Sequence, residues 1–526
     1  MDSLVAQSGS KKLSKLLLLL FIAIFFIPAY FFLFESFLSE EARSFPLWQS
    51  QLLRPIFRVL QSTFIQALLS SLGSGVLGLG FGFFLAFFDF SHKHQWVKFF
   101  RLLGNYCYTL PGVSVAMFVL LAARAFPAIP SQGLWAIVWA HIFMNFLYVS
   151  IQVFYLLTAW LSKTGKQDLE NAWMLGMSPL RSIVTLMPRI LAPQFFSIIV
   201  PVFLYSCVAF STVLILGADP QIATPEVLLF YFASSDPNPE RLRFVFLWVF
   251  VFYSILFLLF RKYLKPKEHF NFGQWNLGSD FALFKNAPVW SLVLLPLFSL
   301  PALSFLFLPL WRMFEEMLLK QKSVDILWFQ ATLRSFGIAL FAGMLAVLVY
   351  RGLLRSRSSY NQVMMHWIVF SPMQLVLFWL ASPIAAFDID SALLQFLLLS
   401  VLLVALQWPL IAFWIEERKV QLPRELIESS LVLGLSPKQI PSKIFTPLFR
   451  DLEYRIFYTV ALLSFGEIIL FDLFAPRWEV LATLSRQTAS RYDFFGVSWS
   501  LLMTFVFGIL LSILGRYFSR VGNKLK

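Results

Sequence analysis

Charged side chains are scarce in this sequence of 526 residues: Asp, Glu, Lys and Arg together make up 13% of it, whereas hydrophobic residues make up 59%. Soluble domains contain roughly 25% charged and about 45–50% apolar residues. The mean hydropathy is +0.75. A soluble core cannot bury this much apolar surface, so we expect the lipid bilayer to be the main solvent. The composition therefore predicts an all-α, polytopic membrane protein.

Cysteine and the usual catalytic motifs are also rare or missing from the sequence. The two cysteines, Cys107 and Cys207, both lie within apolar runs, and two thiols alone make a poor metal site. We interpret them as small buried packing residues. The sequence contains no H-E-x-x-H cluster and no G-x-x-x-x-G-K-[S/T] phosphate loop, and TGKQ at 164–167 is only a fragment of the latter. We expect no catalytic residues, no metal and no ATPase activity in this chain.

Basic residues outnumber acidic ones, 42 against 28, which gives a formal net charge of +14. In a soluble chain this excess suggests nucleic-acid binding, but in a membrane protein it is typical of cytoplasmic loops that follow the positive-inside rule. Loops rich in Lys and Arg alternate with loops such as 218–240 and 383–391, which contain neither. We therefore expect no nucleic-acid partner, and we expect both termini to be cytoplasmic.

About twelve apolar segments are long enough to cross a bilayer, which takes about 20 mostly apolar residues. The first follows Lys11, Lys12 and Lys15 and is longer than the apolar region of a signal peptide, about 7–15 residues, so we interpret it as an uncleaved span. The predicted spans are 14–36, 63–90, 101–123, 134–160, 194–217, 243–264, 288–311, 328–353, 363–382, 391–415, 452–474 and 495–517.

A short polar phrase occurs twice, as ENAWMLGMSP at 170–179 and as ESSLVLGLSP at 428–437, with an offset of 258 residues (428 − 170). The longest polar interruption lies between the two copies and divides the chain into a first transmembrane repeat at 1–264, a cytoplasmic linker at 265–288 and a second repeat at 289–526. Both copies are expected on the cytoplasmic side. Two parallel six-helix repeats, related by an axis along the membrane normal, are therefore predicted.

Each copy of the phrase has the local chemistry of a helix, a sharp corner and a second helix. Gly176 suits the left-handed conformation that ends a helix. Ser178 suits the position that caps the next helix, and Pro179 suits its first turn. Gly434, Ser436 and Pro437 repeat this order in the second copy. A short surface helix held by a corner suits docking to a cytoplasmic partner, and the alternative is a connector without a partner.

These polar loops, near 161–193 and 416–450, resemble the EAA loop of permease subunits of binding-protein-dependent ATP-binding-cassette importers. The family pattern is roughly Glu-Ala-Ala, three residues, Gly and, further on, Ile-x-Leu-Pro. The matching residues are Glu170, Ala172, Gly176 and Pro188 in the first copy, and Glu428, Gly434, Ile444 and Pro447 in the second. Asn171, Ser429 and Ser430 stand where the family has alanine, and the first copy is one residue shorter between Gly and Pro.

The resemblance implies a type I (MetI-like) importer permease in the bacterial inner membrane. Each EAA loop would form a coupling helix that docks on one subunit of a separate ATPase dimer, and ATP and Mg²⁺ would be bound by that ATPase. A periplasmic solute-binding protein would deliver the solute. The fused two-repeat arrangement, with AHIFMN at 140–145 and the segments 210–242 and 462–476, is most similar to thiamine-transporter permeases, and next to iron(III)-transporter permeases.

Polar residues within apolar runs are candidates for the translocation pathway because they are costly in a membrane. His141 and Asn145 share one helix face, and Gln407 and Glu467 lie in the second repeat. The alternative for these residues is hydrogen bonding between helices. A secondary transporter driven by an ion gradient is the alternative class, because such proteins use intramembrane carboxylates like that of Glu467. That class leaves the doubled cytoplasmic loops without an explanation.

Overall fold

The computed structural model of the chain describes residues 50–88, 93–161, 165–217, 222–235, 239–264, 293, 296–297, 309–318, 326–354, 392–420, 424–436, 439–440, 444, 448–474, 478–491 and 493–524. Among these residues, every labelled secondary-structure element is an α-helix. The predicted spans 14–36 and 363–382, the linker 265–288 and most of the predicted span 288–311 lie outside the described residues.

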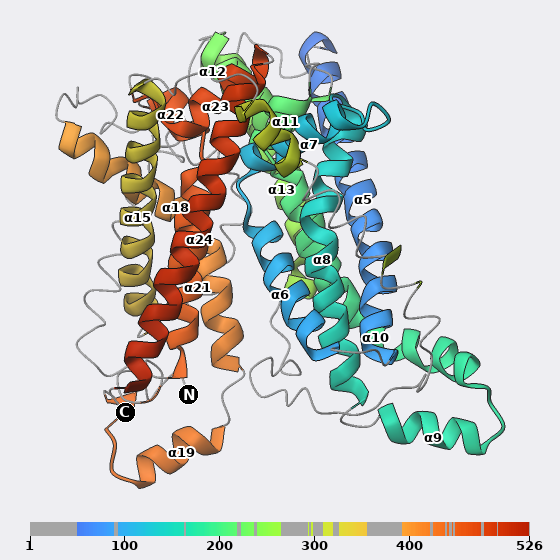
Figure 1. Cartoon of the computed structure of the whole chain (residues 1–526). Coiled ribbons are helices and arrows are strands. Elements are labelled where there is room, and N and C mark those ends of the chain that lie inside the picture. The colour runs from blue at the N-terminus through green and yellow to red at the C-terminus, as the bar shows by residue number, and fades with distance from the viewer. Residues whose placement is uncertain are drawn as a thin grey trace.

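The first helix set consists of the helices from α5 to α13, whose long members run along a common direction (Figure 1). Its long helices are α5 (Ser50–Phe87), α6 (Lys93–Thr109), α8 (Leu134–Trp160), α10 (Pro179–Cys207) and α13 (Pro239–Leu264). Its shorter helices are α7 (Gly112–Ala125), α9 (Lys166–Met174), α11 (Ser211–Leu216) and α12 (Pro225–Ser235). The helix α9 lies at one end of the set, whereas α7, α11 and α12 lie toward the other end.

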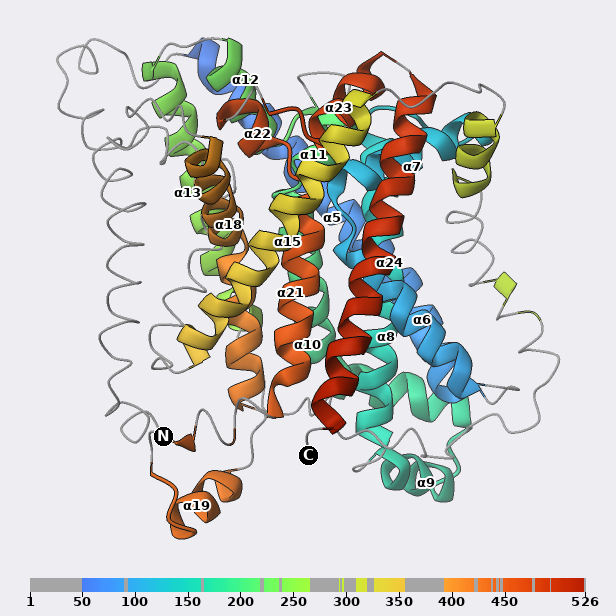
Figure 2. The ribbon, with the colours of Figure 1, turned by 60° about the vertical axis from the view of Figure 1, so that its left-hand side comes forward.

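The second helix set consists of the helices from α15 to α24 and lies beside the first set (Figure 2). Its long helices are α15 (Ile326–Leu354), α18 (Ala392–Val420), α21 (Arg450–Phe465) and α24 (Phe494–Lys524). Its shorter helices are α19 (Arg424–Val432), α22 (Ile469–Phe474) and α23 (Leu481–Ser490). In every view α19 lies at the same end of the molecule as α9, and α22 and α23 lie at the opposite end.

Four helices among the described residues are long and apolar enough to cross a membrane: Leu53–Phe87, Leu134–Trp160, Ile326–Arg351 and Phe494–Leu514. A fifth span results if α6 and α7 are counted as one broken helix. Shorter apolar helical stretches occur at Gln194–Cys207, Phe244–Phe260 and Gln395–Gln407. The chain is therefore an all-α membrane protein. The predicted count of twelve spans goes beyond what these helices show, and it stays a prediction.

The predicted span 101–123 differs from the structure because it is not one straight helix. It breaks at Leu110 and Pro111, and the two pieces, α6 and α7, meet at 106°. Proline has no backbone N–H for the helix ladder and disfavours helical conformation in the residue before it. Pro111 therefore ends α6 and caps the start of α7 with extended dihedral angles, φ −57° and ψ 140°.

The two helix sets repeat each other with the offset of the doubled phrase. The first residues of α8, α9 and α11 recur 258 positions later as the first residues of α18, α19 and α22. The last residues of α10 and α21, Cys207 and Phe465, are also 258 apart. A close approach of a glycine recurs as well: Gly75 of α5 approaches Ile199 of α10, and Gly343 of α15 approaches Phe457 of α21, with offsets of 268 for the glycines and 258 for their partners.

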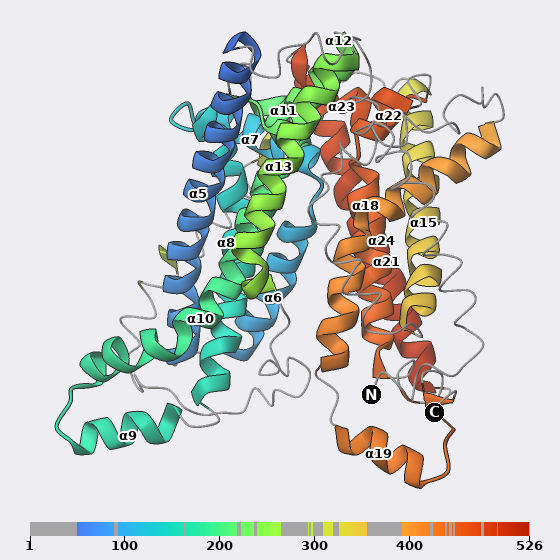
Figure 3. The ribbon, with the colours of Figure 1, turned by 180° about the vertical axis from the view of Figure 1, so that it is seen from behind.

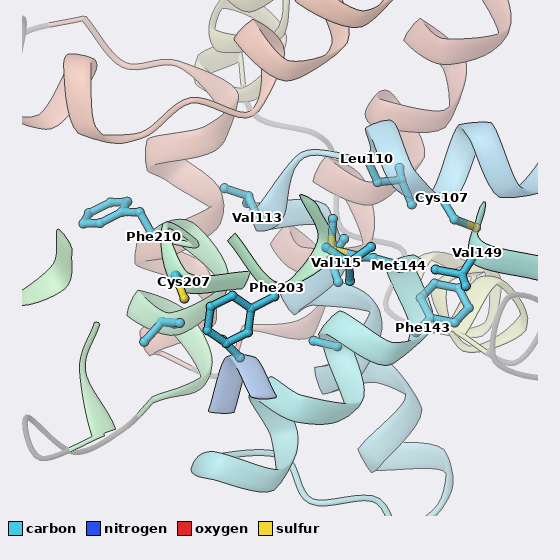
Figure 4. Packing of buried hydrophobic residues seen from close by; sticks show 14 of the residues in the cluster. Cys107, Leu110, Val113, Val115, Phe143, Met144, Val149, Phe203, Cys207 and Phe210 are labelled. Atoms are coloured by element: carbon cyan, nitrogen blue, oxygen red, sulfur yellow. The ribbon is translucent and has the colours of Figure 1, made fainter. Parts of the chain in front are cut away.

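Buried apolar side chains form one large cluster that includes helices of both sets. Figure 4 shows part of this cluster, where side chains of α6, α7, α8 and α10 lie close together. Cys107 and Cys207 belong to it, and both are free thiols that are buried. The interpretation of the cysteines as buried packing residues is confirmed.

Candidate functional site

The first corner, residues 172–178, ends the helix α9 with two nested hydrogen bonds. The Gly176 N–H donates to the Trp173 carbonyl at 2.9 Å, and the Met177 N–H donates to the Ala172 carbonyl at 3.0 Å. Gly176 has φ +82°. These three features define a Schellman motif, in which glycine is favoured because a Cβ is strained at positive φ.

The second corner, residues 430–436, has the same geometry at the end of α19. The Gly434 N–H donates to the Leu431 carbonyl at 3.0 Å, and the Leu435 N–H donates to the Ser430 carbonyl at 3.0 Å. Gly434 has φ +84°. The prediction that a left-handed glycine ends each helix is confirmed. The two corners form one backbone structure that is used twice.

The residues after each glycine cap the next segment. A serine side chain accepts the capping hydrogen bond in the first corner, and a glutamine side chain accepts it in the second. The Ser178 Oγ accepts a hydrogen bond from the Arg181 N–H at 3.4 Å, and Pro179 is the first residue of α10, as predicted. In the second corner, the Ser436 N–H donates to Gln439 Oε1 at 3.0 Å. Pro437 lies outside the described residues. Gln three residues after Ser is half of a capping box, a signal that the sequence analysis missed.

Two large apolar side chains project from each corner into open surroundings. Met174 and Leu175 are 81% and 84% exposed, and Val432 and Leu433, 258 positions later, are 86% and 83% exposed. Sequence reasoning missed this pair, although both copies have two apolar residues directly before the glycine. Exposed apolar groups at matched positions mark a surface suited to a protein partner.

The inner side of α9 is attached to the first helix set. Leu169 and Ala172 are buried, and the Trp173 Nε1–H donates to the Ser182 Oγ of α10 at 3.0 Å. At the position of Ala172 the second set has Ser430, which is also buried and whose hydroxyl donates to the Leu426 carbonyl of the same helix. Both corners therefore present apolar side chains outward, and in the first corner the helix is also joined to α10 by a hydrogen bond.

The other residues of the predicted loops occupy several environments. Glu170 and Glu428 are exposed, and Glu170 lies 3.9 Å from Lys166 on the same helix. An exposed pair at this distance contributes little to stability. Pro188 is an exposed residue inside α10, where the loss of one N–H favours a bend in the helix. Pro447 lies outside the described residues.

Both corners lie at the same end of the molecule, one on each helix set (Figure 3). The helix α12, which contains no Lys or Arg, lies at the opposite end. A single two-fold partner at the corner end could thus contact both sets through equivalent surfaces.

The polar residues predicted for the translocation pathway are distributed over both helix sets. His141 and Asn145 are fully buried in α8, and the Asn145 Nδ2–H donates to the His141 carbonyl at 2.7 Å within that helix. Gln407 of α18 and Glu467, between α21 and α22, are half-buried in the second helix set. The hydrogen bond of Asn145 lies within one helix, and the two expected roles of these residues, interhelical bonding and a pathway wall, stay predictions.

Glu467 nevertheless marks a place where helix breaks meet. A Cβ on the preceding Gly466 would lie 2.0 Å from the Pro111 Cβ, so the break between α21 and α22 abuts the break between α6 and α7. The Thr212 Oγ1–H of α11 donates to the Gly112 carbonyl at 3.2 Å. Nearby, the Ser114 Oγ–H of α7 donates to the Thr504 Oγ1 of α24 at 3.0 Å. Interrupted helices of both sets therefore meet at one interface.

Comparison with known proteins gives no match to a family model, to a curated protein or to a solved structure. Among the described residues, no group of three or more His, Cys, Asp or Glu side chains is placed to hold a metal ion. The two corners and the helices that carry them therefore form the candidate functional site.

Proposed function

We propose that this chain is the permease subunit of an ATP-driven importer of the binding-protein-dependent, ATP-binding-cassette type. The observation that carries the proposal is the doubled corner: two Schellman motifs, 258 residues apart, each with two apolar side chains more than 80% exposed. Two equivalent docking surfaces at one end of the molecule are what a two-fold ATPase dimer needs. A connector without a partner has no use for exposed apolar tips.

The corners transmit movement because they are short and rigid. A positive-φ glycine and two backbone hydrogen bonds fix the angle between the docking helix and the helix that follows it. Met174 and Leu175 enter one ATPase subunit, and Val432 and Leu433 enter the other. When the ATPase dimer closes on ATP and Mg²⁺, which it binds itself, the corners approach each other and the two helix sets move apart at the opposite end.

The number of spans and their division into repeats are part of the same proposal. We propose twelve spans in two parallel six-helix repeats of the type I importer fold, with the linker at 265–288 between them. The recurrence of helix bounds with an offset of 258 supports this division. The corners and both termini face the cytoplasm of a bacterium, and the end that carries α12 faces a periplasmic solute-binding protein.

Thiamine is the proposed solute, and iron(III) is the second candidate. This order rests on the similarity of 140–145, 210–242 and 462–476 to thiamine-transporter permeases. The competing class, an ion-gradient-driven transporter, has one observation in its favour: Glu467 is half-buried beside a helix break, and intramembrane carboxylates serve such transporters.

The test reconstitutes the chain in liposomes with the ATPase and the binding protein encoded beside its gene. We expect uptake that requires all three proteins and ATP. M174S/L175S and V432S/L433S should each reduce ATPase co-purification and uptake at least ten-fold, because each pair loses its apolar contact. F126S is the control, since Phe126 is 50% exposed and follows α7, toward the other end of the molecule. Gradient-driven uptake by the chain alone, or full ATPase binding by both double variants, would overturn the proposal.

A further inference from the structure

A bidentate ion pair joins α15 to α21 in the second helix set. The Arg351 Nε–H donates to Glu453 Oε1 and the Nη2–H donates to Oε2, both at 2.9 Å. The Glu453 side chain is 13% exposed. The Arg351 side chain is 52% exposed, so solvent screens part of the attraction. A guanidinium that engages both carboxylate oxygens still fixes orientation as well as distance.

The position of this pair relates it to the second corner. Glu453 lies in the first turn of α21, the long helix that follows the corner at 430–436, and Arg351 lies near the end of α15. The pair therefore holds α21 against α15 just where the chain returns from the corner to the helix set.

The first helix set has no charges at the equivalent positions. The matched approaches of Gly75 to Ile199 and of Gly343 to Phe457 align the two packed pairs with offsets of 268 and 258. With these offsets, Arg351 corresponds to Phe83 and Glu453 corresponds to Phe195. Phe195 is half-buried, and its ring lies 3.4 Å from where a Cβ on Gly75 would be. Phe195 therefore packs against α5 through its ring, where Glu453 forms an ion pair with α15.

The two corners also differ in the side chains that hold them to their helix sets. The first corner is tied directly to α10 by the hydrogen bond from Trp173 to Ser182. The equivalent positions in the second copy are Leu431 and Ile440, whose side chains cannot form a hydrogen bond. The hydrogen bond from Trp173 to Ser182 therefore has no counterpart at these two positions.

We infer that Arg351 and Glu453 are positioning residues that couple the second corner to its helix set. This inference rests on the proposed function for its consequence, since the movement to be coupled is that of an ATPase. Displacement of α19 pulls on the start of α21, and the ion pair passes that displacement to α15 instead of letting the first turn of α21 unwind. In the first set, the hydrogen bond from Trp173 to Ser182 joins the docking helix to α10 directly.

The test uses R351M, E453Q and the exchanged pair R351E/E453R in the full chain, reconstituted with its ATPase and binding protein. We expect each single variant to lower the number of solute molecules moved per ATP hydrolysed by at least three-fold, with ATPase binding retained. The exchanged pair should recover at least half of the ratio. R101M is the control, because the exposed Arg101 donates to the Tyr155 hydroxyl rather than to a carboxylate.

A second measurement separates this inference from the proposed function. In the chain alone, in lipid nanodiscs, hydrogen exchange of residues 450–453 should be at least three-fold faster in R351M and E453Q than in R101M, whether or not the chain transports anything. An unchanged transport-to-ATP ratio in both single variants, failure of the exchanged pair to recover it, or unchanged exchange at 450–453 would each overturn the inference. Absence of ATP-driven uptake by the unmodified chain would overturn the proposed function instead.

Discussion

Arg124, the penultimate residue of α7, forms an ion pair with Glu316, and its guanidinium carbon lies 4.3 Å from the centre of the Phe494 ring. Phe494 begins α24, so this arginine contacts the second helix set. The contact lies at the end of the molecule opposite the two corners. In the proposed cycle it must separate when the corners approach each other, and it therefore favours the conformation with the corners apart.

Loss of this contact should raise ATP hydrolysis in the absence of the binding protein. Arg124 is 40% exposed as a side chain, so the pair contributes about 1 kcal/mol, and its loss shifts the conformational balance roughly five-fold. We expect R124M and E316Q to increase basal hydrolysis by the reconstituted complex by that factor. R334M is the control, because Arg334 is an exposed arginine that donates to the Glu479 carbonyl within the second set. Basal hydrolysis equal to that of R334M would contradict this role.

The close approach of Gly466 to Pro111 leads to a second prediction, which concerns thermal stability. A methyl group at Gly466 would lie 2.0 Å from the Pro111 Cβ and 3.3 Å from its Cα, and a backbone atom cannot move aside as a flexible side chain can. Overpacking of this kind costs about 1–3 kcal/mol. We expect G466A to lower the midpoint of thermal unfolding in detergent.

The control for this substitution is G337A in α15, where a Cβ would meet nothing within 4 Å. Alanine is favoured over glycine inside a helix, so G337A should leave the midpoint equal or higher. A double variant, G466A/P111G, should lose less stability relative to P111G than G466A loses relative to the unmodified chain, because the Cβ that the new methyl group meets is then absent. Equal midpoints for G466A and G337A would show that the two helix breaks are not in tight contact.

The sequence predicted local backbone conformation better than contacts between distant residues. The conformations of Gly176 and Gly434 were predictable because a glycine directly after a short helical segment has few other uses. The bend at Pro111 was missed because the span 101–123 was predicted from its apolar composition, and composition does not show where a helix turns. The pairs Arg124–Glu316 and Arg351–Glu453 join residues 192 and 102 positions apart, and no single-sequence pattern connects such positions.

The hydrogen bond from Trp173 to Ser182 should stabilise the first corner but not the second. W173F removes the donor and keeps the aromatic packing, so it should cost about 1 kcal/mol, or roughly five-fold faster hydrogen exchange in α9. Exchange in α19 should not change. W135F is the control, because Trp135 is 59% exposed in the first turn of α8. Equal acceleration in α9 and α19 would show that the corners are not anchored separately.

The corner glycines provide the most direct test of the doubled surface. A Cβ at Gly176 or Gly434 would meet nothing within 4 Å, so a substitution there creates no clash and its cost is conformational. Positive φ costs an L-residue about 1–2 kcal/mol. We expect G176V and G434V to insert normally and to unwind the Schellman motif, so that ATPase co-purification and uptake both fall several-fold. G176N and G434N should be milder, because asparagine tolerates the left-handed conformation.

The relative effects of valine and asparagine show whether docking depends on the corner geometry or only on its apolar surface. If docking depended on the apolar tips alone, valine would preserve or strengthen it, since it adds apolar surface without a clash. If docking depends on the angle that the positive-φ glycine fixes, valine must be worse than asparagine at both positions. Uptake and ATPase co-purification, measured side by side for G176V, G176N, G434V and G434N with G337A as the helical-glycine control, decide between the two. Valine variants as active as G337A would contradict the role of the corner geometry.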